Sequence, residues 1–350
     1  MRGWLVMLGS ALLLSAGAAT AAAVPGPARL PKTFLPSALS FWSTESGIIA
    51  GVDPSANRVY LATTSDAGRT WRVRLRIPEG ALYVADVFVA TSSRGRGWLT
   101  VETCLRQGGY PFGRCRIRAV ETVDGGARWT AGGPQSVSFS FAGRDGWAIV
   151  ARGAGLLQAR LYRLTATGGG LRLRRARVAA PCSGDLNGEG PALGAVAAFG
   201  GRQALLVCTG PQGTLASAVT VQPKHFYATS DGGRTWHAVL TVPPSATASG
   251  LGLGALLGMT FLPDGRGWLW SARGGLYATR DWGRSWTLDH LVQEREVEEA
   301  LSVSFVDDRT GYALLQGAPH GPYIRLMRTR DGGRHWTQVG GFTPAAAGHS

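Results

Sequence analysis

Short apolar runs separated by turn residues make up most of this chain. In its clearest stretch, the alternation of apolar and polar positions predicts strands near Leu301–Val306, Gly311–Gln316, Tyr323–Thr329 and His335–Val339. Helical periodicity is almost absent, and only Leu291–Ala300 is suited to a turn or two of helix. The pattern therefore predicts an all-β protein built from short antiparallel strands.

A corner motif, Thr-x-Asp-x-Gly-x-x-Trp, occurs five times along the chain. The copies lie at Thr64–Trp71, Thr122–Trp129, Thr229–Trp236, Thr279–Trp286 and Thr329–Trp336. The last three begin 50 residues apart, and the wider gap before them contains a decayed copy, with Ala166 in place of the Asp and Leu171 in place of the Trp. A period of this length indicates an array of supersecondary units.

Each residue type of the corner has a structural task. The Asp side chain accepts hydrogen bonds from the backbone amides just ahead of it, and the Gly adopts a positive φ without steric cost. The Trp begins the next strand with a large apolar side chain. We therefore assign the corner to a turn between the third and fourth strands of a unit rather than to catalysis. Its structural residues are Asp66, Trp71, Asp124, Trp129, Asp231, Trp236, Asp281, Trp286, Asp331 and Trp336.

A second element alternates with the corners. It is a strand ending in Phe, then a polar turn, then a Gly that is often followed by an aromatic residue. Its copies are Phe41…Gly47, Phe88…Gly97, Phe141…Gly146, Phe261…Gly267 and Phe305…Gly311, with a weaker one at Phe199–Ala204. Six such elements and six corners, the decayed one included, give four short strands per unit. The sequence thus predicts a six-bladed β-propeller of four-stranded antiparallel blades over residues 38–341. The alternative is seven blades, one of them too degraded to identify.

The strand order places both kinds of turn on one face of the disc, the corner face. The second-to-third and blade-to-blade connections lie on the opposite, long-loop face, where connection lengths vary. Insertions gathered on one face of a repeat array mark a binding surface, and neutral drift at tolerant sites is the alternative explanation. The binding residues predicted there are Arg106, Tyr110, Phe112, Arg114, Asp185, Glu189, Glu294, Glu296 and Tyr323.

The N-terminus has the layout of a secretory signal peptide, with Arg2, an apolar run and an alanine-rich end. We expect cleavage after Ala23, which makes residues 1–23 the signal peptide. An uncleaved membrane anchor is the alternative, because the apolar run just reaches spanning length. Residues 24–37 are expected to form a tether and residues 342–350 a tail. The protein is therefore expected outside the cell or in the cell envelope.

Cysteines and charge refine this picture. Four cysteines in an exported chain suggest disulfides, and the strand order favours the pairs Cys104–Cys115 and Cys182–Cys208. Their expected role is to fix long loops. A net charge of +14 favours transient contact with anionic surfaces, whereas the export signal argues against nucleic acid. The histidines and cysteines show no metal-ligand spacing, so neither a metal nor another cofactor is expected.

The corners resemble the Asp-box, or BNR, repeat of sialidases and many other propellers. Together with the Phe-turn-Gly element, the unit is most similar to the repeat of the photosystem II stability/assembly-factor family, as in Phe305–Tyr312 followed by Thr329–Trp336. The resemblance covers nearly all of the chain beyond the signal segment. It implies an exported, non-catalytic propeller that acts as a binding or assembly scaffold for a protein or a cell-envelope polymer.

A glycoside hydrolase of the sialidase type is the alternative function. Its chemistry needs three arginines on the substrate carboxylate, a Tyr nucleophile paired with a Glu, and an Asp acid/base. The family's aromatic-Arg-Ile-Pro motif precedes the first corner, whereas Arg76-Ile77-Pro78 follows the first corner here and comes after a Leu. Tyr323 and Glu298 are the residues that such chemistry could recruit. We therefore expect no catalytic residue and a binding function.

Overall fold

The structure is a computed structural model of the 350-residue chain. It describes residues 29–78, 83–92, 95–104, 115–132, 138–143, 145–150, 159–167, 172–182, 192–214, 220–244, 250–272, 275–289, 299–317 and 323–343. In these ranges the regular elements are β-strands, and no helix there is long and apolar enough to cross a membrane. The predicted all-β class is confirmed. Of the stretch suited to helix, Glu299 and Ala300 begin a strand, and residues 291–298 lie outside the described residues.

Six antiparallel four-stranded sheets form the blades of a propeller. Blade 1 contains β1 (Leu35–Phe41), β2 (Gly47–Asp53), β3 (Arg58–Thr64) and β4 (Arg72–Pro78). Blade 2 contains β5 (Tyr83–Ser92), β6 (Arg96–Cys104), β7 (Cys115–Thr122) and β8 (Thr130–Ala131). Blade 3 contains β9 (Ser138–Ala142), β10 (Asp145–Val150), β11 (Arg160–Thr167) and β12 (Arg172–Arg177).

The second half of the chain repeats this plan. Blade 4 contains β13 (Ala192–Ala198), β14 (Ala204–Thr209), β17 (Lys224–Thr229) and β18 (His237–Val242), with a separate hairpin of β15 (Gly213–Thr214) and β16 (Thr220–Val221). Blade 5 contains β19 (Leu256–Phe261), β20 (Gly267–Ser271), β21 (Gly275–Thr279) and β22 (Thr287–Asp289). Blade 6 contains β23 (Glu299–Phe305), β24 (Gly311–Gln316), β25 (Ile324–Thr329) and β26 (Trp336–Phe342).

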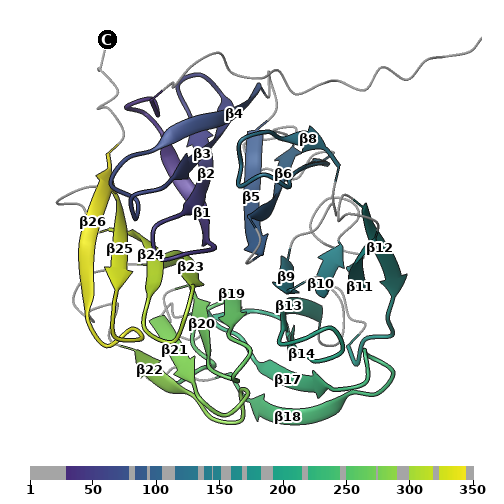
Figure 1. Cartoon of the computed structure of the whole chain (residues 1–350). Coiled ribbons are helices and arrows are strands. Elements are labelled where there is room, and N and C mark those ends of the chain that lie inside the picture. Colours follow the sequence, from purple (N-terminus) through teal and green to yellow (C-terminus); the bar gives the residue numbers. More distant parts are fainter. Residues whose placement is uncertain are drawn as a thin grey trace, which may run out of the picture.

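The blades stand around a central axis, with the first strand of each blade innermost (Figure 1). Neighbouring inner strands lie against one another, including β1 against both β5 and β23. Each blade consists of strands that follow one another along the chain, so no blade combines strands from the two ends of the chain. Packing between blade 6 and blade 1 therefore closes the ring. The prediction of six blades is confirmed.

Hydrogen bonds and a pair of stacked rings join blade 6 to blade 1. The backbone N–H groups of Leu39 and Phe41 donate to the hydroxyl oxygens of Ser302 and Ser304, over 3.1 and 3.0 Å. Phe41 stacks on the buried Tyr312 with ring centroids 3.6 Å apart. Buried backbone groups need hydrogen-bond partners. The inner strands of blades 6 and 1 are therefore joined by hydrogen bonds as well as by packing.

The corners adopt one repeated geometry. In the first, the Thr64 hydroxyl donates to the Asp66 carboxylate over 2.8 Å, and the N–H of Gly68 donates to the same hydroxyl over 3.0 Å. The carboxylate also accepts the N–H of Thr70 over 2.9 Å. The corner glycine has a positive φ, +85° at Gly68. The other four corners repeat the Thr-to-Asp bond at 2.8–2.9 Å.

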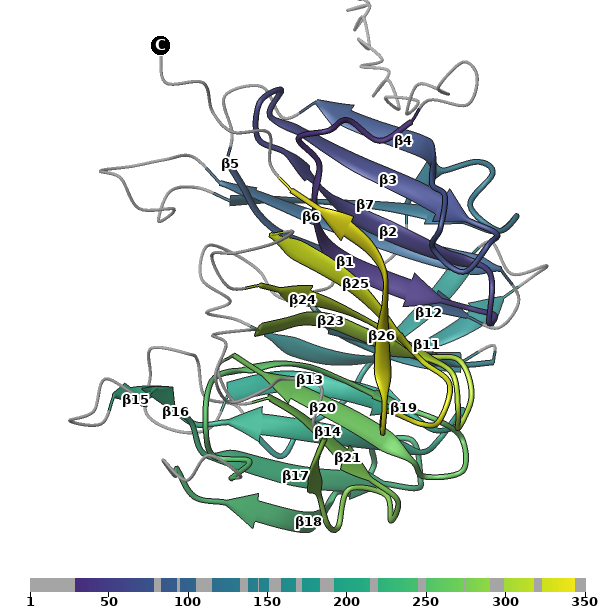
Figure 2. The same ribbon diagram turned by 90° about the vertical axis from the view of Figure 1, so that its left-hand side faces the viewer.

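Each corner is also bound to the first turn of its own blade. The N–H that follows the corner Asp donates to a carbonyl in that turn, as from Gly232 to Arg202 over 2.9 Å and from Gly332 to Arg309 over 2.8 Å. Both kinds of turn therefore share the corner face. In the side view of Figure 2 the β15–β16 hairpin projects from the opposite, long-loop face.

The corner tryptophans pack between blades. Trp129 belongs to a buried cluster formed by blades 1 and 2, and Trp71 packs against the cluster that joins blades 6 and 1. Trp236, Trp286 and Trp336 hold the same position at the three interfaces from blade 3 to blade 6. Each tryptophan thus fastens its blade to the preceding one.

The interface between blades 2 and 3 is different. Among the described residues no buried apolar cluster joins these two blades, whereas each of the other five interfaces has one. Blade 3 is the blade whose corner has decayed, with Leu171, outside the described residues, at the tryptophan position. A stack of Trp98 on Phe141, with centroids 3.8 Å apart, connects the two blades.

The Phe-turn-Gly element has a direct steric explanation. The ring of Phe305 covers Gly311, where a Cβ would stand 2.5 Å from the ring, and it stacks on Trp268 of blade 5 at 3.4 Å. Blade 2 departs from the sequence interpretation, because Thr91 rather than Phe88 pairs with Gly97. Without a Phe at this position, the Thr91 hydroxyl instead bonds that of Ser40 in blade 1 over 2.7 Å.

We predict that Trp129→Ala lowers the free energy of unfolding by about 3–5 kcal/mol, because it removes a large side chain that is 7% exposed from the core between blades 1 and 2. Val123→Ala in the same corner is the control. Val123 is 43% exposed, and its truncation should change stability by at most about 0.5 kcal/mol. Chemical denaturation measures both variants, and equal losses would contradict the assigned role of the tryptophan.

Candidate functional site

A channel runs along the propeller axis and holds a cavity of about 580 Å³. All six inner strands line it, mainly with apolar side chains and with the hydroxyls of serine and threonine. Several hydroxyls are already engaged, since those of Ser138 and Ser140 accept the N–H groups of Val196 and Ala198. The volume lies within the usual range of about 300–1,000 Å³ for small-ligand sites.

A β-bulge near the long-loop end recurs in the inner strands. The strand register shifts at Pro36/Ala38, Val84/Asp86, Leu193/Ala195, Leu256/Gly258 and Ala300/Ser302. The extra residues in four of these strands, Ser37, Gly194, Leu257 and Leu301, line the channel. Bulges re-aim side chains and are common beside functional sites. Here they set the composition of the channel mouth on the long-loop face.

Blade 2 extends further toward that face than the other blades. In blades 1, 2, 5 and 6 the paired residues of the first two strands can be counted from the glycine at the start of the second strand. On this count the bulge of blade 2 lies two residues further from the glycine than the bulges of blades 1, 5 and 6. Phe88 therefore stands where the other three blades have the small residues Ala38, Gly258 and Ser302. The additional pair of positions brings Asp86 to the channel mouth.

Asp86 is the only charged side chain among the described residues that line the channel. Its cross-strand partner is Glu102, which is 8% exposed. Enclosure by the surrounding protein, with a smaller contribution from the Glu102 charge, raises the pKa of Asp86 to about 6. Burial also raises the pKa of Glu102. Water in the channel still reaches Asp86, which is exposed, so the penalty for ionising it is smaller than that of a fully buried carboxylate.

This acidic pair does not have the arrangement of a glycosidase centre. Directly opposed residues of an antiparallel pair share one face of the sheet, so Asp86 and Glu102 stand side by side on one blade. Glycosidase carboxylates instead flank the scissile bond, with a gap for the sugar or for water. No arginine, tyrosine or second carboxylate is found among the described residues of the lining.

One of the binding residues predicted from the sequence, Tyr323, lies among the described residues. Tyr323 comes immediately before β25, is 41% exposed, and accepts a hydrogen bond from the Gln316 amide over 2.6 Å. Glu298 of the glycosidase alternative lies outside the described residues. So do the other predicted binding residues, which are Arg106, Tyr110, Phe112, Arg114, Asp185, Glu189, Glu294 and Glu296.

Sequence reasoning missed Asp86, Glu102 and Leu257. A signal for the two acids was present, because each is a carboxylate inside an otherwise apolar strand, YVADVFVATS and RGWLTVETC. Their register, which makes them neighbours, was not readable from the residues alone. Nothing in the local sequence marks Leu257 as exposed, because the bulge that turns it outward depends on pairing with β20.

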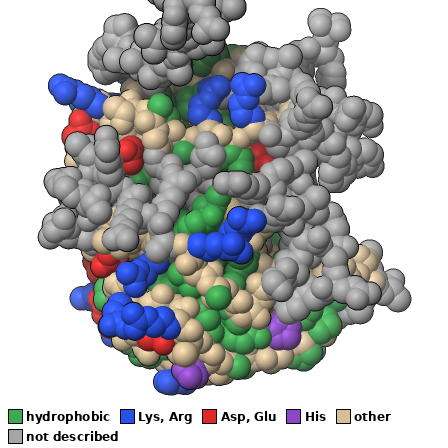
Figure 3. All heavy atoms as spheres, turned by 90° about the vertical axis from the view of Figure 1, so that its right-hand side faces the viewer, with side chains coloured by type: hydrophobic (Ala, Val, Ile, Leu, Met, Phe, Trp, Pro, Cys, Tyr) green, Lys and Arg blue, Asp and Glu red, His purple; other side chains and the backbone are tan. Residues whose placement is uncertain are grey.

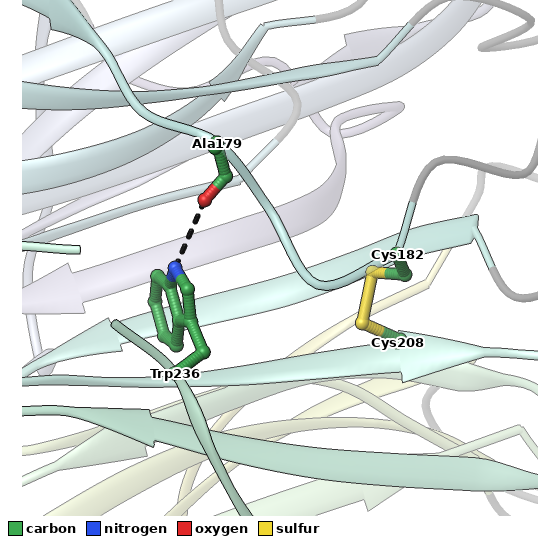
Figure 4. The surroundings of a disulfide bond; sticks show 4 residues. All are labelled: Ala179, Cys182, Cys208 and Trp236. Atoms are coloured by element: carbon green, nitrogen blue, oxygen red, sulfur yellow. Dashed lines mark hydrogen bonds between the residues drawn. A yellow bond between two sulfur atoms is a disulfide. The ribbon is translucent and has the colours of Figure 1, made fainter. Parts of the chain in front are cut away.

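A disulfide fixes one connection of the long-loop face. Cys182, in the connection that enters blade 4, is bonded to the buried Cys208 of β14. Three residues before Cys182, the carbonyl of Ala179 accepts a 2.9 Å hydrogen bond from the indole of Trp236 (Figure 4). Cys104 is also disulfide-bonded, and Cys115 is the residue opposite it in the β6–β7 register.

Basic charge is spread over the surface. On the side shown in Figure 3, lysine and arginine side chains form several separate groups among apolar and neutral atoms. A small hollow of about 320 Å³ on the corner face is lined by Arg163, Arg202 and Arg234, and two carboxylates, those of Asp145 and Asp231, line it as well. Because arginines and carboxylates lie side by side in this hollow, much of its charge is balanced internally. The channel mouth is therefore the stronger candidate site.

Comparisons with known proteins identify the fold. No protein-family model matches the sequence, and no curated protein matches it. Among solved structures, YCF48 bound to a D1 peptide is 19% identical, with 89% of this chain and 83% of that chain covered and a TM-score of 0.45. YCF48 from Cyanidioschyzon merolae is 14% identical, with 91% and 87% covered and a TM-score of 0.39.

A glycosidase propeller is also similar. The GH93 α-L-arabinofuranosidase of Fusarium graminearum, solved with arabinobiose, is 11% identical, with 89% of this chain and 98% of that chain covered and a TM-score of 0.53. The expected likeness to propeller proteins is confirmed at the level of fold by the GH93 structure. At these identities the fold is what is shared.

We predict that replacing Cys182 and Cys208 by serine lowers the free energy of unfolding by about 2–4 kcal/mol, since the bond constrains the unfolded chain across 26 residues. Thermal unfolding with and without a reductant measures this. A reductant should reduce the melting temperature of the native protein more than that of the double variant. Equal responses would contradict a stabilising role for this bond.

We predict opposite pH dependences for two aspartates. The pKa of Asp86 is raised to about 6, so its ionisation is less favourable in the fold than in the unfolded chain. Stability should therefore fall, relative to Asp86→Asn, as pH rises from about 4 to 7. Burial would also raise the pKa of Asp53, but hydrogen bonds from Ser55 and Thr33 outweigh it and lower that pKa.

Asp53 is the matched control for this experiment. Its contribution is present above the unfolded pKa and is lost as the solution becomes more acidic. Asp53→Asn should therefore lose stability relative to the native protein most strongly near neutral pH, whereas Asp86→Asn gains it there. Urea denaturation of the three proteins at several pH values tests this, and parallel curves for the two variants would refute it.

Proposed function

We propose that this chain is an exported, non-catalytic β-propeller that binds a macromolecular partner through its long-loop face. One observation carries the proposal. Only three large apolar side chains of the described residues are strongly exposed, and two of them, Leu257 and Tyr323, lie at the long-loop ends of blades 5 and 6. Large apolar and aromatic side chains that are exposed on one face are typical of interaction sites.

The corner face offers less to a partner. Its carboxylates and amides are bonded within each corner and to the first turn of the same blade. The signal-peptide layout of residues 1–23 supports export. The partner class that we propose is a protein or a cell-envelope polymer.

Site-specific photocrosslinking tests this function. A photoreactive amino acid is placed at Leu257, at Tyr323 or at Val123, which is 43% exposed on the corner face and serves as the matched control. On intact cells that produce each variant, we expect the same discrete adduct from the two long-loop positions and none from Val123. An adduct pattern shared by all three positions would contradict a binding site on the long-loop face.

The glycosidase alternative is tested separately. Purified protein is incubated with fluorogenic sialosides, α-L-arabinofuranosides and other glycosides, and we expect no turnover above the heat-denatured control. Asp86 is the carboxylate that lines the channel among the described residues, so Asp86→Asn is the matched variant and should show the same absence of turnover. Turnover that disappears in this variant would overturn the non-catalytic proposal.

A further inference from the structure

A buried lysine lies where blade 4 meets the connection into blade 5. Lys224, the first residue of β17, is 0% exposed, and its side-chain nitrogen donates to the backbone carbonyls of Gln222 and Gly254 over 3.2 and 3.0 Å. Among the described residues no carboxylate pairs with it. A buried charge without a counter-charge is costly, so packing alone does not explain a lysine at this position.

The propeller repeat itself does not require a lysine here. At the matching position, five residues before the corner Thr, blades 1 and 6 have Val59 and Ile324, which are 1% and 3% exposed, and blade 2 has Ile117. An apolar side chain therefore meets the needs of the fold at the position of Lys224. Such a departure from the local rule is expected where a chain serves a function.

Gln222 adds to the hold that blade 4 has on the connection into blade 5. It is 3% exposed, and its side-chain carbonyl accepts the N–H of Leu256 over 2.9 Å. Its backbone N–H donates to the carbonyl of Gly252 over 2.9 Å. With the bond from Lys224, blade 4 therefore holds three points of Gly250–Leu256, which we call the entry segment.

The entry segment leads directly to the exposed Leu257. The bulge between Leu256 and Gly258 follows at once, and Leu257 within it is 43% exposed and lines the channel. On the other side of this bulge, the ring of Trp270 covers Gly258, where a Cβ would stand 2.4 Å from the ring. The position of Leu257 is therefore fixed from blade 4 on one side and from blade 5 on the other.

We propose that Lys224 and Gln222 are positioning residues for partner docking, because they hold the entry segment and so keep Leu257 presented on the long-loop face. This inference rests on the proposed docking of a partner at that face. Both residues are buried, so they act through the entry segment and do not touch the partner. Residues of one blade thereby control a contact that the next blade makes.

Hydrogen exchange of the entry segment tests this role. Lys224→Met keeps a long side chain in place but removes its two hydrogen bonds. We expect the protection factors of the Leu253 and Leu256 amides to fall about tenfold, as the loss of a charge-assisted bond implies. The stability of the whole protein should fall much less, because the change also removes a buried charge.

Matched variants locate the effect. Ile324→Met, at the same position of blade 6, should leave the entry segment as protected as in the native protein. Gln222→Met should lower the protection of the Leu256 amide, which gives a second route if Lys224→Met does not fold by circular dichroism. Unchanged protection in the folded variants, or an equal loss of protection in all six blades, would overturn the proposal.

The charge of Lys224 gives a second readout. Burial lowers the pKa of Lys224 to about 8, and no charged group of the described residues adds to this shift. The titratable neighbours are His225, the next residue of β17, and Tyr277 of β21, whose hydroxyl donates to the Gly250 carbonyl over 3.0 Å. Burial raises the pKa of Tyr277 to about 12. A window from about pH 7.5 to 9.5 lies above the usual range of histidine and below that tyrosine.

Within this window the direction of the effect is fixed. The pKa of Lys224 in the fold lies below its ordinary value of 10.5, so protonation favours the open, hydrated state of the amine. The protection factors of the entry segment should therefore rise about tenfold or more from about pH 7.5 to 9.5 in the native protein, and stay constant in Lys224→Met. The same rise in both proteins would overturn the assignment to Lys224.

Photocrosslinking connects this role to docking and separates the two proposals. In the Lys224→Met background the adduct from Leu257 should form severalfold less, whereas the adduct from Tyr323 should be unchanged. If the entry segment loses protection but the Leu257 adduct keeps its full yield, the positioning role is refuted and the proposed function stands. If the native protein gives no adduct from Leu257 or Tyr323, the docking face is refuted, and the role of Lys224 in docking is refuted with it.

Discussion

The packing of each corner tryptophan against the preceding blade is the interaction on which the rest of this structure depends. A four-stranded sheet of this length cannot bury both of its faces alone, and in a ring every blade must be covered by its neighbours. The Thr–Asp–Gly hydrogen bonds hold the five corners in one geometry, so that the indole lies in the same place at the five interfaces that have a corner tryptophan. Stability and the position of the inner strands both follow from this repeated contact.

The ring is not uniform, and its departures coincide in blade 2 and at the border with blade 3. Blade 3 has lost its corner tryptophan, and no apolar cluster of described residues joins these two blades. Blade 2 has the longest inner pair of strands, with Phe88 where blades 1, 5 and 6 carry small residues and with Asp86 and Glu102 opposite each other. Deviation from local rules is expected where a fold serves a function. The channel mouth is thus the place at which this chain departs most from its own repeat.

The two faces of the disc have different roles. On the corner face, polar atoms are used for folding, since the corners and first turns satisfy each other's hydrogen bonds. On the long-loop face, bulges in the inner strands open the channel mouth, and a disulfide together with the Trp236 indole holds the connection into blade 4. A binding role on the long-loop face therefore needs no change in the corners, whose polar atoms are used within the fold.

The sequence by itself determined the class, the number of blades and the two-faced arrangement. Those properties arise from local interactions that recur every 50 residues or so, and a repeat such as Thr329–Trp336 can be read directly. Only the tertiary structure decided that Thr91 rather than Phe88 faces Gly97, and that Asp86 and Glu102 are neighbours. The reason is that strand register and bulges depend on pairing between segments, and a shift of one residue reverses which side chains meet.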